Sequence, residues 1–260
     1  MAIITISRGT FAGGERLTEL LGQRLGYRTI SRETLYARVQ EDYGITEDEL
    51  VQIMTWAPSR LDATGDGRRR LFASIQAALC ELLRGDDVVY HGQAGHLLLP
   101  GVRHVVRVRL IAPRVKRIEM AMEREGINPQ QASVKIDQVD AERARWTEFV
   151  FGANWADPSL YDLLLNLERM SLDSAAEMVC RAVALPDFQT NDESRARMNA
   201  LSIKSGVLAR LLNDPATADL DLKVEVDGGE ATIYGLTDQR RAAQVLEVAR
   251  RGGQNARIEP

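Results

Sequence analysis

The fold is decided by residues 2–26, AIITISRGTFAGGERLTELLGQRLG, where a short apolar run meets a glycine-bearing segment and then an amphipathic one. Residues 2–6 predict a buried strand, and four leucines between residues 17 and 25 fall on one face of a following helix. A glycine turn at a helix N-terminus gathers backbone N–H groups and the positive end of the helix dipole, which suits a phosphate. The alternative is that the glycines only make a tight turn from strand to helix.

The glycine spacing favours a phosphate loop, although two neighbouring residues depart from the usual motif. The spacing from Gly9 to Gly14 fits the glycines of GxxxxGK[ST]. Glu15 stands where that motif has its lysine, and Arg16 stands where it has a hydroxyl residue. The sequence therefore predicts the loop geometry without the lysine that usually contacts the phosphate.

Composition is typical of a soluble globular protein with one large domain or two unequal ones. The chain has 260 residues, of which 45% are hydrophobic and 27% charged, and its net charge of −4 argues against a generally basic nucleic-acid-binding surface. Cys80 and Cys180 have neither metal-type spacing nor a disulfide framework, which favours a reducing compartment. No apolar stretch reaches the roughly 18 residues of a membrane span, so we expect a cytoplasmic protein without a transmembrane segment.

Strands alternate with helices as far as residue 184. Further strands are predicted at residues 27–30, 88–91, 105–112 and 163–167, and helices at 33–55, 71–83, 114–125 and 171–184, with a loop at 64–67. Apolar strands in this order indicate a parallel sheet covered on both faces. The ligand is then expected beyond the C-terminal ends of the strands.

The last 75 residues follow a different pattern. Residues 186–197 are polar and read as a linker, and a helix is predicted at 203–212. Residues 222–226 alternate strictly and pair, through a turn at 227–229, with a return strand at 231–234. A helix through residue 249 and an edge strand at 256–258 complete a small α+β module of about 60 residues, near the lower limit for a self-sufficient core.

Three segments together resemble the cytidylate-kinase-like family of P-loop proteins, which are related to nucleoside monophosphate kinases. They are residues 4–35 (ITISRGTFAGGERLTELLGQRLGYRTISRETL), 88–127 (VVYHGQAGHLLLPGVRHVVRVRLIAPRVKRIEMAMEREGI) and 157–179 (DPSLYDLLLNLERMSLDSAAEMV). Residues 222–253 (LKVEVDGGEATIYGLTDQRRAAQVLEVARRGG) resemble a BON domain, a module associated with small ligands of the phospholipid type and with protein assembly. We therefore predict a P-loop domain at 1–185, a linker at 186–198 and a BON-like domain at 199–260.

The resemblance implies a five-stranded parallel sheet flanked by helices, an ATP site with Mg²⁺ at the first loop, a monophosphate-binding region around residues 31–62 and a lid near 127–158. It assigns ATP binding to Ser7, Gly9, Gly13, Gly14 and Arg16, and substrate binding to Arg32, Gly92 and Gln93. The chain departs from the family where an Arg-Glu pair becomes Glu15-Arg16 and where an aspartate becomes Ser31. It also has Gly92-Gln93-Ala94 where cytidylate kinases have Gly-Arg-Asp.

Arginines suit phosphoryl transfer because their planar donors pair two phosphate oxygens at once. Arg114 and Arg117 lie in a run of basic residues that the resemblance places beside the lid. The lid itself carries Asp137, Asp140, Arg143 and Arg145, in which Asp140 can orient Arg143 from three residues away. The alternative is an exposed charged helix with ordinary ion pairs. We expect Arg143 to be largely exposed without nucleotide, and Asp157 and Asp162 to form turns rather than bind metal.

Three functions remain open from the sequence. The favoured one is transfer of a phosphoryl group from ATP to a nucleoside monophosphate such as CMP. The second is a nucleotide sensor without catalysis, in which the kinase-like body and the tail regulate one another. The third places the function in the tail, as a module that binds a small ligand or a protein partner or that forms oligomers. No nucleic-acid partner is expected, and the sequence identifies no metal ligand.

Overall fold

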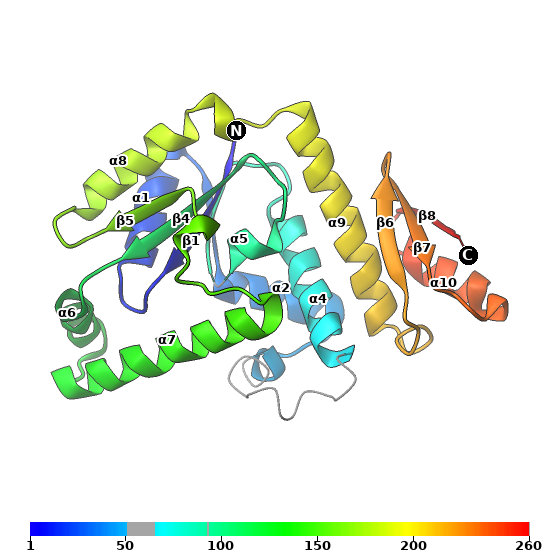
Figure 1. Cartoon of the computed structure of the whole chain (residues 1–260), viewed down its shortest axis with the longest axis horizontal. Coiled ribbons are helices and arrows are strands. Elements are labelled where there is room, and N and C mark those ends of the chain that lie inside the picture. The colour runs from blue at the N-terminus through cyan, green and yellow to red at the C-terminus, as the bar shows by residue number, and fades with distance from the viewer. Residues whose placement is uncertain (51–65, 93, 260) are drawn as a thin grey trace. The chain divides into compact units, whose positions relative to one another are not determined.

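The computed structural model describes residues 1–50, 66–92 and 94–259. The chain forms two compact units, Met1–Arg32 with Gly85–Asn191 and Glu33–Arg84 with Asp192–Pro260 (Figure 1). Each unit is therefore assembled from two separate stretches of the chain. Within the described residues, no helix is both long enough and apolar enough to cross a membrane.

The first unit is built on a parallel five-stranded sheet, as the sequence predicts. Its strands have the order β2-β3-β1-β4-β5, and all four neighbouring pairs run parallel. The strands are β1 (Ile3–Arg8), β2 (Arg28–Ser31), β3 (Val88–His91), β4 (Val105–Ile111) and β5 (Leu163–Asn166). The fold is thus the α/β class expected, with β1 in the middle of the sheet.

The helices of this unit lie between the strands in sequence, except α8, which follows β5. They are α1 (Gly14–Leu25), α5 (Gly95–Leu98), α6 (Arg114–Glu125), α7 (Pro129–Phe151) and α8 (Leu172–Val183), with short 3₁₀ turns at Pro158–Leu160 and Pro186–Phe188. Helix α7 begins with a capping box, in which the Asn128 side chain accepts from the Gln131 N–H and the Gln131 side chain accepts from the Asn128 N–H. The predicted lid region, 127–158, is therefore mostly one long helix.

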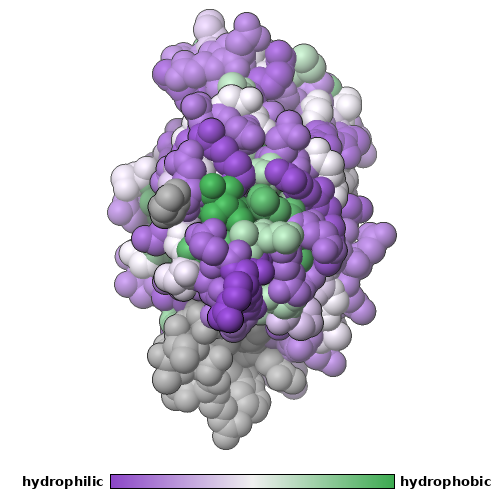
Figure 2. Space-filling model, turned by 90° about the vertical axis from the view of Figure 1, so that its right-hand side faces the viewer, coloured by the Kyte–Doolittle hydropathy of each residue, from purple (hydrophilic) through white to green (hydrophobic). Residues whose placement is uncertain are grey.

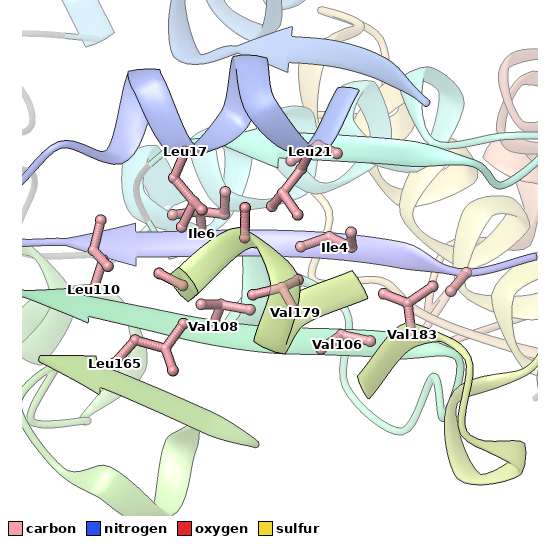
Figure 3. Close-up of a cluster of buried hydrophobic side chains, with 14 of the residues drawn as sticks. Ile4, Ile6, Leu17, Leu21, Val106, Val108, Leu110, Leu165, Val179 and Val183 are labelled. Atoms are coloured by element: carbon pink, nitrogen blue, oxygen red, sulfur yellow. The ribbon is translucent and has the colours of Figure 1, made fainter. Parts of the chain in front are cut away.

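An apolar core fills the space between one face of this sheet and two helices (Figure 3). Leu17 and Leu21 of α1 and Val179 of α8 pack onto Ile4 and Ile6 of β1. All five side chains are fully buried or within 1% of it. Because this core fixes α1 against β1, it also fixes the loop that joins them.

The loop between β1 and α1 lies where the order of the strands changes direction. Strand β1 has β3 on one side and β4 on the other, and the chain leaves β1 at Arg8, at the C-terminal edge of the sheet. Open α/β sheets bind their ligands at this point, because the connections on either side turn away from each other. The sheet therefore places the predicted phosphate loop at the position that such folds use.

The second unit pairs helices that are far apart in sequence. It contains α2 (Arg32–Tyr43), α4 (Asp66–Leu82), α9 (Asp192–Asn213), α10 (Ala242–Arg250) and a 3₁₀ turn at Gln239–Arg241. The small side chains of Ala73, Ala77 and Ala209 let α4 and α9 pack closely. Polar bonds at one end add to this contact, because Asn213 accepts from Arg70 Nε at 2.7 Å and donates to Ser74 Oγ at 2.9 Å.

A three-stranded sheet completes the second unit. Strands β6 (Lys223–Asp227) and β7 (Glu230–Tyr234) form an antiparallel hairpin, and β8 (Asn255–Ile258) pairs with β7 in parallel. Val224 and Ile233 face each other on the side that packs on α9 and α10. Figure 2 views the molecule from the side of these C-terminal elements and shows a small apolar area ringed by hydrophilic residues.

Several predicted boundaries differ from the structure. The helix predicted at 33–55 is broken after Tyr43, where Gly44 takes a positive φ, and residues 47–50 are helical again. Helix α4 begins at Asp66, inside the predicted loop 64–67. Residues 192–197 of the predicted linker form the first turns of α9 rather than an extended segment. Helix α9 includes these residues because it buries Ser194 and Met198. It also carries Asp192 and Glu193 in its first turn, where the helix dipole favours negative charge. The separate folding of residues 1–185 and 199–260 stays a prediction.

The packing of α4 on α9 predicts a selective effect of a charged side chain at Ala209. In Ala209→Arg, a guanidinium would enter a fully buried position without an acidic partner. We expect the free energy of unfolding to fall by roughly 3 kcal/mol or more. Asn199→Arg, at an exposed position of the same helix, is expected to stay within about 0.5 kcal/mol of the parent. Equal urea midpoints for the two variants would contradict the helix contact.

Candidate functional site

The loop after β1 turns sharply before α1 begins. The Ala12 N–H bonds to the Gly9 carbonyl at 3.1 Å, and Phe11 and Gly13 take positive φ values of 57° and 83°. Helix α1 starts at Gly14, and within the described residues no side chain caps this end. The first N–H groups of a helix have no intrahelical partner. The loop therefore offers the open helix end that a phosphate group uses.

A carboxylate from α7 holds the loop in this conformation. Asp140 Oδ1 accepts from the Thr10 N–H at 2.9 Å and from the Thr10 hydroxyl at 2.7 Å. Its other oxygen, Oδ2, accepts from Arg117 Nη2 at 2.5 Å. The same donors, a backbone N–H, a hydroxyl and a guanidinium, are those that bind phosphate oxygens in proteins. Asp140 thus occupies an anion-binding arrangement at the loop.

Two arginines from different helices reach the loop beside this carboxylate. Arg117 of α6 donates from Nε to the Thr10 carbonyl at 2.7 Å, and its guanidinium lies over Gly9, where an added Cβ would be 3.1 Å from Cζ. Arg143 of α7 donates from Nη1 to the Thr10 hydroxyl at 3.0 Å and to the Arg8 carbonyl at 3.2 Å. The side chain of Arg143 is only 13% exposed, so the prediction of an exposed lid arginine was wrong.

A third arginine, Arg8, lies half-buried at the end of β1. Its Nη1 is 3.4 Å from the Gly92 carbonyl, which it approaches as a hydrogen-bond donor. Burial, together with the positive charge of Arg143, lowers the pKa of Arg8 to about 9. A cation that is poorly solvated and close to another cation gains most from a nearby anion. Arg8 therefore adds to the attraction of this region for negatively charged groups.

His91 at the end of β3 borders the same loop. An added Cβ at Gly14 would be 2.8 Å from His91 Nε2 and 2.9 Å from Arg8 Cγ, so only glycine allows this approach. Burial and the charge of Arg8 lower the pKa of His91 to about 2, so its ring is neutral at physiological pH. In the described part of the chain, His91 Nε2 has no hydrogen-bond partner.

Polar and aromatic groups also lie near Ser7. The Tyr161 hydroxyl is 3.2 Å from Ser7 Oγ, and Arg109 Nη1 donates to the Trp155 carbonyl at 2.7 Å. The Arg109 guanidinium also lies over the Trp155 ring, 4.5 Å from its centre. Trp146, in contrast, packs edge-on against Phe151 within the lid helix region. Trp155 thus contacts Arg109, and Trp146 packs against Phe151.

The structure brings together most of the residues that the sequence assigns to the site. Around the loop lie Ser7, Gly9, Gly13, Gly14, Arg117 and Arg143. Gly92 contacts Arg8, and the charge of Arg32 contributes to lowering the pKa values of Arg8 and His91. The sequence predicts that Asp140 orients Arg143. In the structure, Arg143 Nη1 lies 4.0 Å from Asp140 Oδ1.

Three other candidates make different contacts. Arg16 is 59% exposed and pairs with Glu19 at 2.8 Å, away from the loop. Arg114 pairs with Asp137 at 2.6 Å on the exposed side of α7, and Arg145 is exposed. Glu15, at the usual lysine position, pairs with Arg124 of α6 at 2.6 Å. Gln93 and residues 51–62 of the predicted monophosphate-binding region lie outside the described residues.

The sequence interpretation missed Arg8 and His91 as parts of the site. Both end a buried strand and directly precede a glycine, at Arg8-Gly9 and His91-Gly92. In a parallel sheet the last residue of a strand beside a switch in strand order faces the ligand region. This position was the signal that could have identified them.

The described residues contain no evident metal site. Among residues 1–50, 66–92 and 94–259, no group of three or more His, Cys, Asp and Glu side chains is arranged to hold an ion. As predicted, Asp157 supports a turn, since it accepts from the Ser159 N–H at 2.8 Å. Asp162 instead accepts from the Arg107 N–H of β4 at 2.8 Å and pairs with the Arg107 guanidinium at 2.7 Å. Mg²⁺ usually needs only one or two carboxylates when substrate phosphates supply its other ligands.

The chain is similar to several known proteins. The curated cytidylate kinase of Thermococcus kodakarensis is 24% identical over 181 residues, which cover 70% of this chain and 87% of that protein. The cytidylate kinase of Ignicoccus hospitalis is 25% identical over 183 residues, covering 70% and 98% respectively. A crystal structure of an uncharacterized protein from Eubacterium ventriosum superimposes with a TM-score of 0.55 and 17% identity, covering 70% of this chain and 97% of the other.

The match to a family model assigns the chain to a family more firmly than any single relative does. A model of the cytidylate kinase-like family matches residues 3–169. This range contains all five strands of the first sheet, the loop after β1, and the residues of α6 and α7 that contact it. By its sequence over this range, the chain belongs to the cytidylate kinase-like family.

Proposed function

We propose that this protein transfers a phosphoryl group from ATP, with Mg²⁺, to a nucleoside monophosphate such as CMP. The observation that carries the proposal is the convergence of Arg8, Arg117 and Arg143 on the loop between β1 and α1. The names of the curated relatives, all cytidylate kinases at 22–26% identity, support the acceptor class. Mg²⁺ would supply charge neutralisation of the phosphates and would arrive with the nucleotide.

The three arginines replace the missing motif lysine in this proposal. During transfer, the bond from the γ-phosphorus to the ADP oxygen breaks as the bond to the acceptor phosphate oxygen forms, so negative charge spreads over the moving group. Arg143 is placed to neutralise that charge, because it already donates to the loop hydroxyl. Arg8 contributes a fixed positive charge at the base of the loop, and Arg117 orients the loop through Thr10.

A second function is favoured by two specific observations. Glu15 occupies the lysine position and is paired with Arg124, and Asp140 fills the anion-binding arrangement at Thr10. A protein that binds nucleotide without transferring phosphate, and signals through its C-terminal unit, would have the same features. The resemblance of residues 222–253 to a BON domain, the small ligand or protein partner it implies, oligomer formation and the cytoplasmic location stay predictions.

The deciding experiment is a coupled assay of ADP release with ATP, Mg²⁺ and each nucleoside monophosphate in turn, with ATP binding measured in parallel by calorimetry. Turnover with a pyrimidine monophosphate well above the background ATPase rate would support the kinase proposal. ATP binding without transfer to any monophosphate would contradict it and favour the sensor.

The first prediction from the proposed function concerns Gly13, which has a positive φ at the start of α1. Gly26 has a positive φ of 70° at the other end of the same helix and provides the matched control. Alanine at either position costs about 1–2 kcal/mol of backbone strain. With ATP and Mg²⁺ at ten times Kd, the parent protein and Gly26→Ala should gain about 1.4 kcal/mol of stability, whereas Gly13→Ala should gain almost none. An equal thermal shift in both variants would rule out the phosphate loop.

The second prediction concerns the lid arginines. Arg143→Ala removes a guanidinium that contacts the loop, so we expect turnover to fall on the order of 1,000-fold while ATP affinity changes much less. Arg145 is exposed on the same helix, and Arg145→Ala should stay within about threefold of the parent, as exposed positions usually do. Steady-state kinetics and calorimetry measure the two effects. Similar losses in both variants would contradict the assignment.

The third prediction concerns acid stability. Native His91 stays neutral down to about pH 2, whereas in the unfolded chain the ring takes up a proton near pH 6.5, so stability falls as the pH drops below 6.5. The slope is about 1.4 kcal/mol per pH unit for each such histidine. Burial lowers the pKa of His96 to about 4, so it acts in the same direction between pH 6.5 and 4.

Urea unfolding at pH 6.5, 5.5 and 4.5 tests this expectation. His91→Asn should show a pH slope lower than the parent by about 1 kcal/mol per unit, and the double variant with His96→Asn should be flatter still. An unchanged slope in His91→Asn would mean that the native imidazole titrates normally.

A further inference from the structure

A cavity of about 400 Å³ lies within the second unit, apart from the loop site. Its walls come from four elements: α2, α4, α9 and the turn after α10 at residues 251–254. Every lining residue belongs to Glu33–Arg84 or Asp192–Pro260. A cavity of this size is within the roughly 300–1,000 Å³ range of small-molecule sites.

Arginines are the most frequent charged residues of the lining. It comprises four arginines, two acids and neutral groups, among them Arg38, Arg84, Arg210, Arg251, Asp42 and Glu81. Three of the arginines are paired with carboxylates: Arg38 with Asp42 at 2.7 Å and Glu41 at 3.6 Å, Arg84 with Glu81 at 3.3 Å, and Arg251 with Asp214 at 2.5 Å and Glu247 at 3.2 Å. The fourth, Arg210, forms no ion pair within the described residues, so its charge is the one in the lining without a carboxylate partner there.

Arg210 is bound only by neutral groups. Its Nη2 donates to the Ala249 carbonyl at 3.1 Å and to Gln254 Oε1. Its Nε is buried and has no hydrogen-bond partner in the part of the chain that the structure describes. Burial lowers the pKa of Arg210, because the surroundings solvate its charge poorly. A half-buried guanidinium without a carboxylate partner is stabilised by an anion that can reach it.

Two glycines keep space open in front of this guanidinium. An added Cβ would lie 3.5 Å from Arg210 Nη1 at Gly206 and 3.3 Å from the same atom at Gly252. Longer side chains at either position would extend into the cavity beside Nη1. Tyr43 and Ser202 also line the cavity, and the Ser202 hydroxyl donates to Glu81 Oε1 at 3.3 Å.

We propose that this cavity binds a small oxyanion, a phosphate monoester or a carboxylate, with Arg210 as its principal cation. The site is additional to the proposed kinase site, since none of its lining residues contacts the loop after β1. Helices α2 and α4 belong to the family segment, and α9 and residues 251–254 to the C-terminal segment. The bound anion would therefore contact both segments and act as an effector that links them.

The test uses the full chain with two probes, inorganic phosphate and succinate, and follows hydrogen–deuterium exchange by mass spectrometry. At the cavity, we expect slower exchange in residues 33–43, 76–84, 200–213 and 249–256. Phosphate bound at the kinase loop would instead slow exchange in residues 9–17, so the two sites are distinguished in one experiment. Gly13→Ala, which impairs the loop, should leave protection at the cavity intact.

Two variants remove the site in different ways. Arg210→Gln deletes the cation and should weaken binding by at least about 10-fold, as expected for a charged hydrogen bond. Gly206→Leu keeps every charge, fills the cavity and suits a helix, so it tests the site even where Arg210→Gln fails to fold. Arg240→Gln, at a side chain that is 91% exposed, is the matched control and should bind as the parent does.

Protection at the cavity that both variants abolish would support the proposal, and the probe that produces it would identify the phosphate or the carboxylate class. Protection confined to residues 9–17, or none with either probe, would overturn it. Retention of cavity protection in Gly206→Leu would overturn it as well. None of these results depends on whether the protein transfers a phosphoryl group.

Discussion

The bond between Asp140 and Thr10 is the contact on which the loop site depends. One carboxylate ties the loop backbone, the Thr10 hydroxyl and Arg117 to the middle of α7. This contact both favours and opposes phosphate binding. It holds in place the hydrogen-bond donors that a phosphate needs, and it also competes with that phosphate for them. In the proposed function, a nucleotide phosphate would replace Asp140 as the anion at the loop, and α7 is the element that carries Asp140.

The charge of the missing motif lysine is present, but it comes from other parts of the chain. Arg8 from β1, Arg117 from α6 and Arg143 from α7 approach the loop from different directions. A lysine within the loop moves with it, whereas Arg117 and Arg143, on two separate helices, keep their position only while those helices stay in place. Catalysis that relies on them is therefore sensitive to helix packing, and a nucleotide-sensing role uses the same sensitivity.

The sequence predicted the first sheet well and the helix partners poorly. Strands such as residues 88–91 are short apolar runs between clear breaks, so local pattern alone defines them. The site candidates with glycine signatures, Gly9 and Gly14, were likewise found from local spacing. Arg16 was assigned by its position in a motif, and Arg114 because the resemblance places its helix beside the lid. Their exposed ion pairs depend on which way a helix faces. The pairing of α4 with α9 rests on alanines that carry no distinctive pattern.

The split composition of the second unit has a consequence for synthesis on the ribosome. Helix α4 ends at Leu82, and its partner α9 begins at Asp192, so roughly 110 residues separate them in the order of translation. At about 5–20 residues per second, α4 waits roughly 5–20 s before α9 can cover Ala73 and Ala77. During that interval the nascent chain exposes surface that the finished protein hides, which makes α4 a segment where chaperones can bind before the C-terminus emerges.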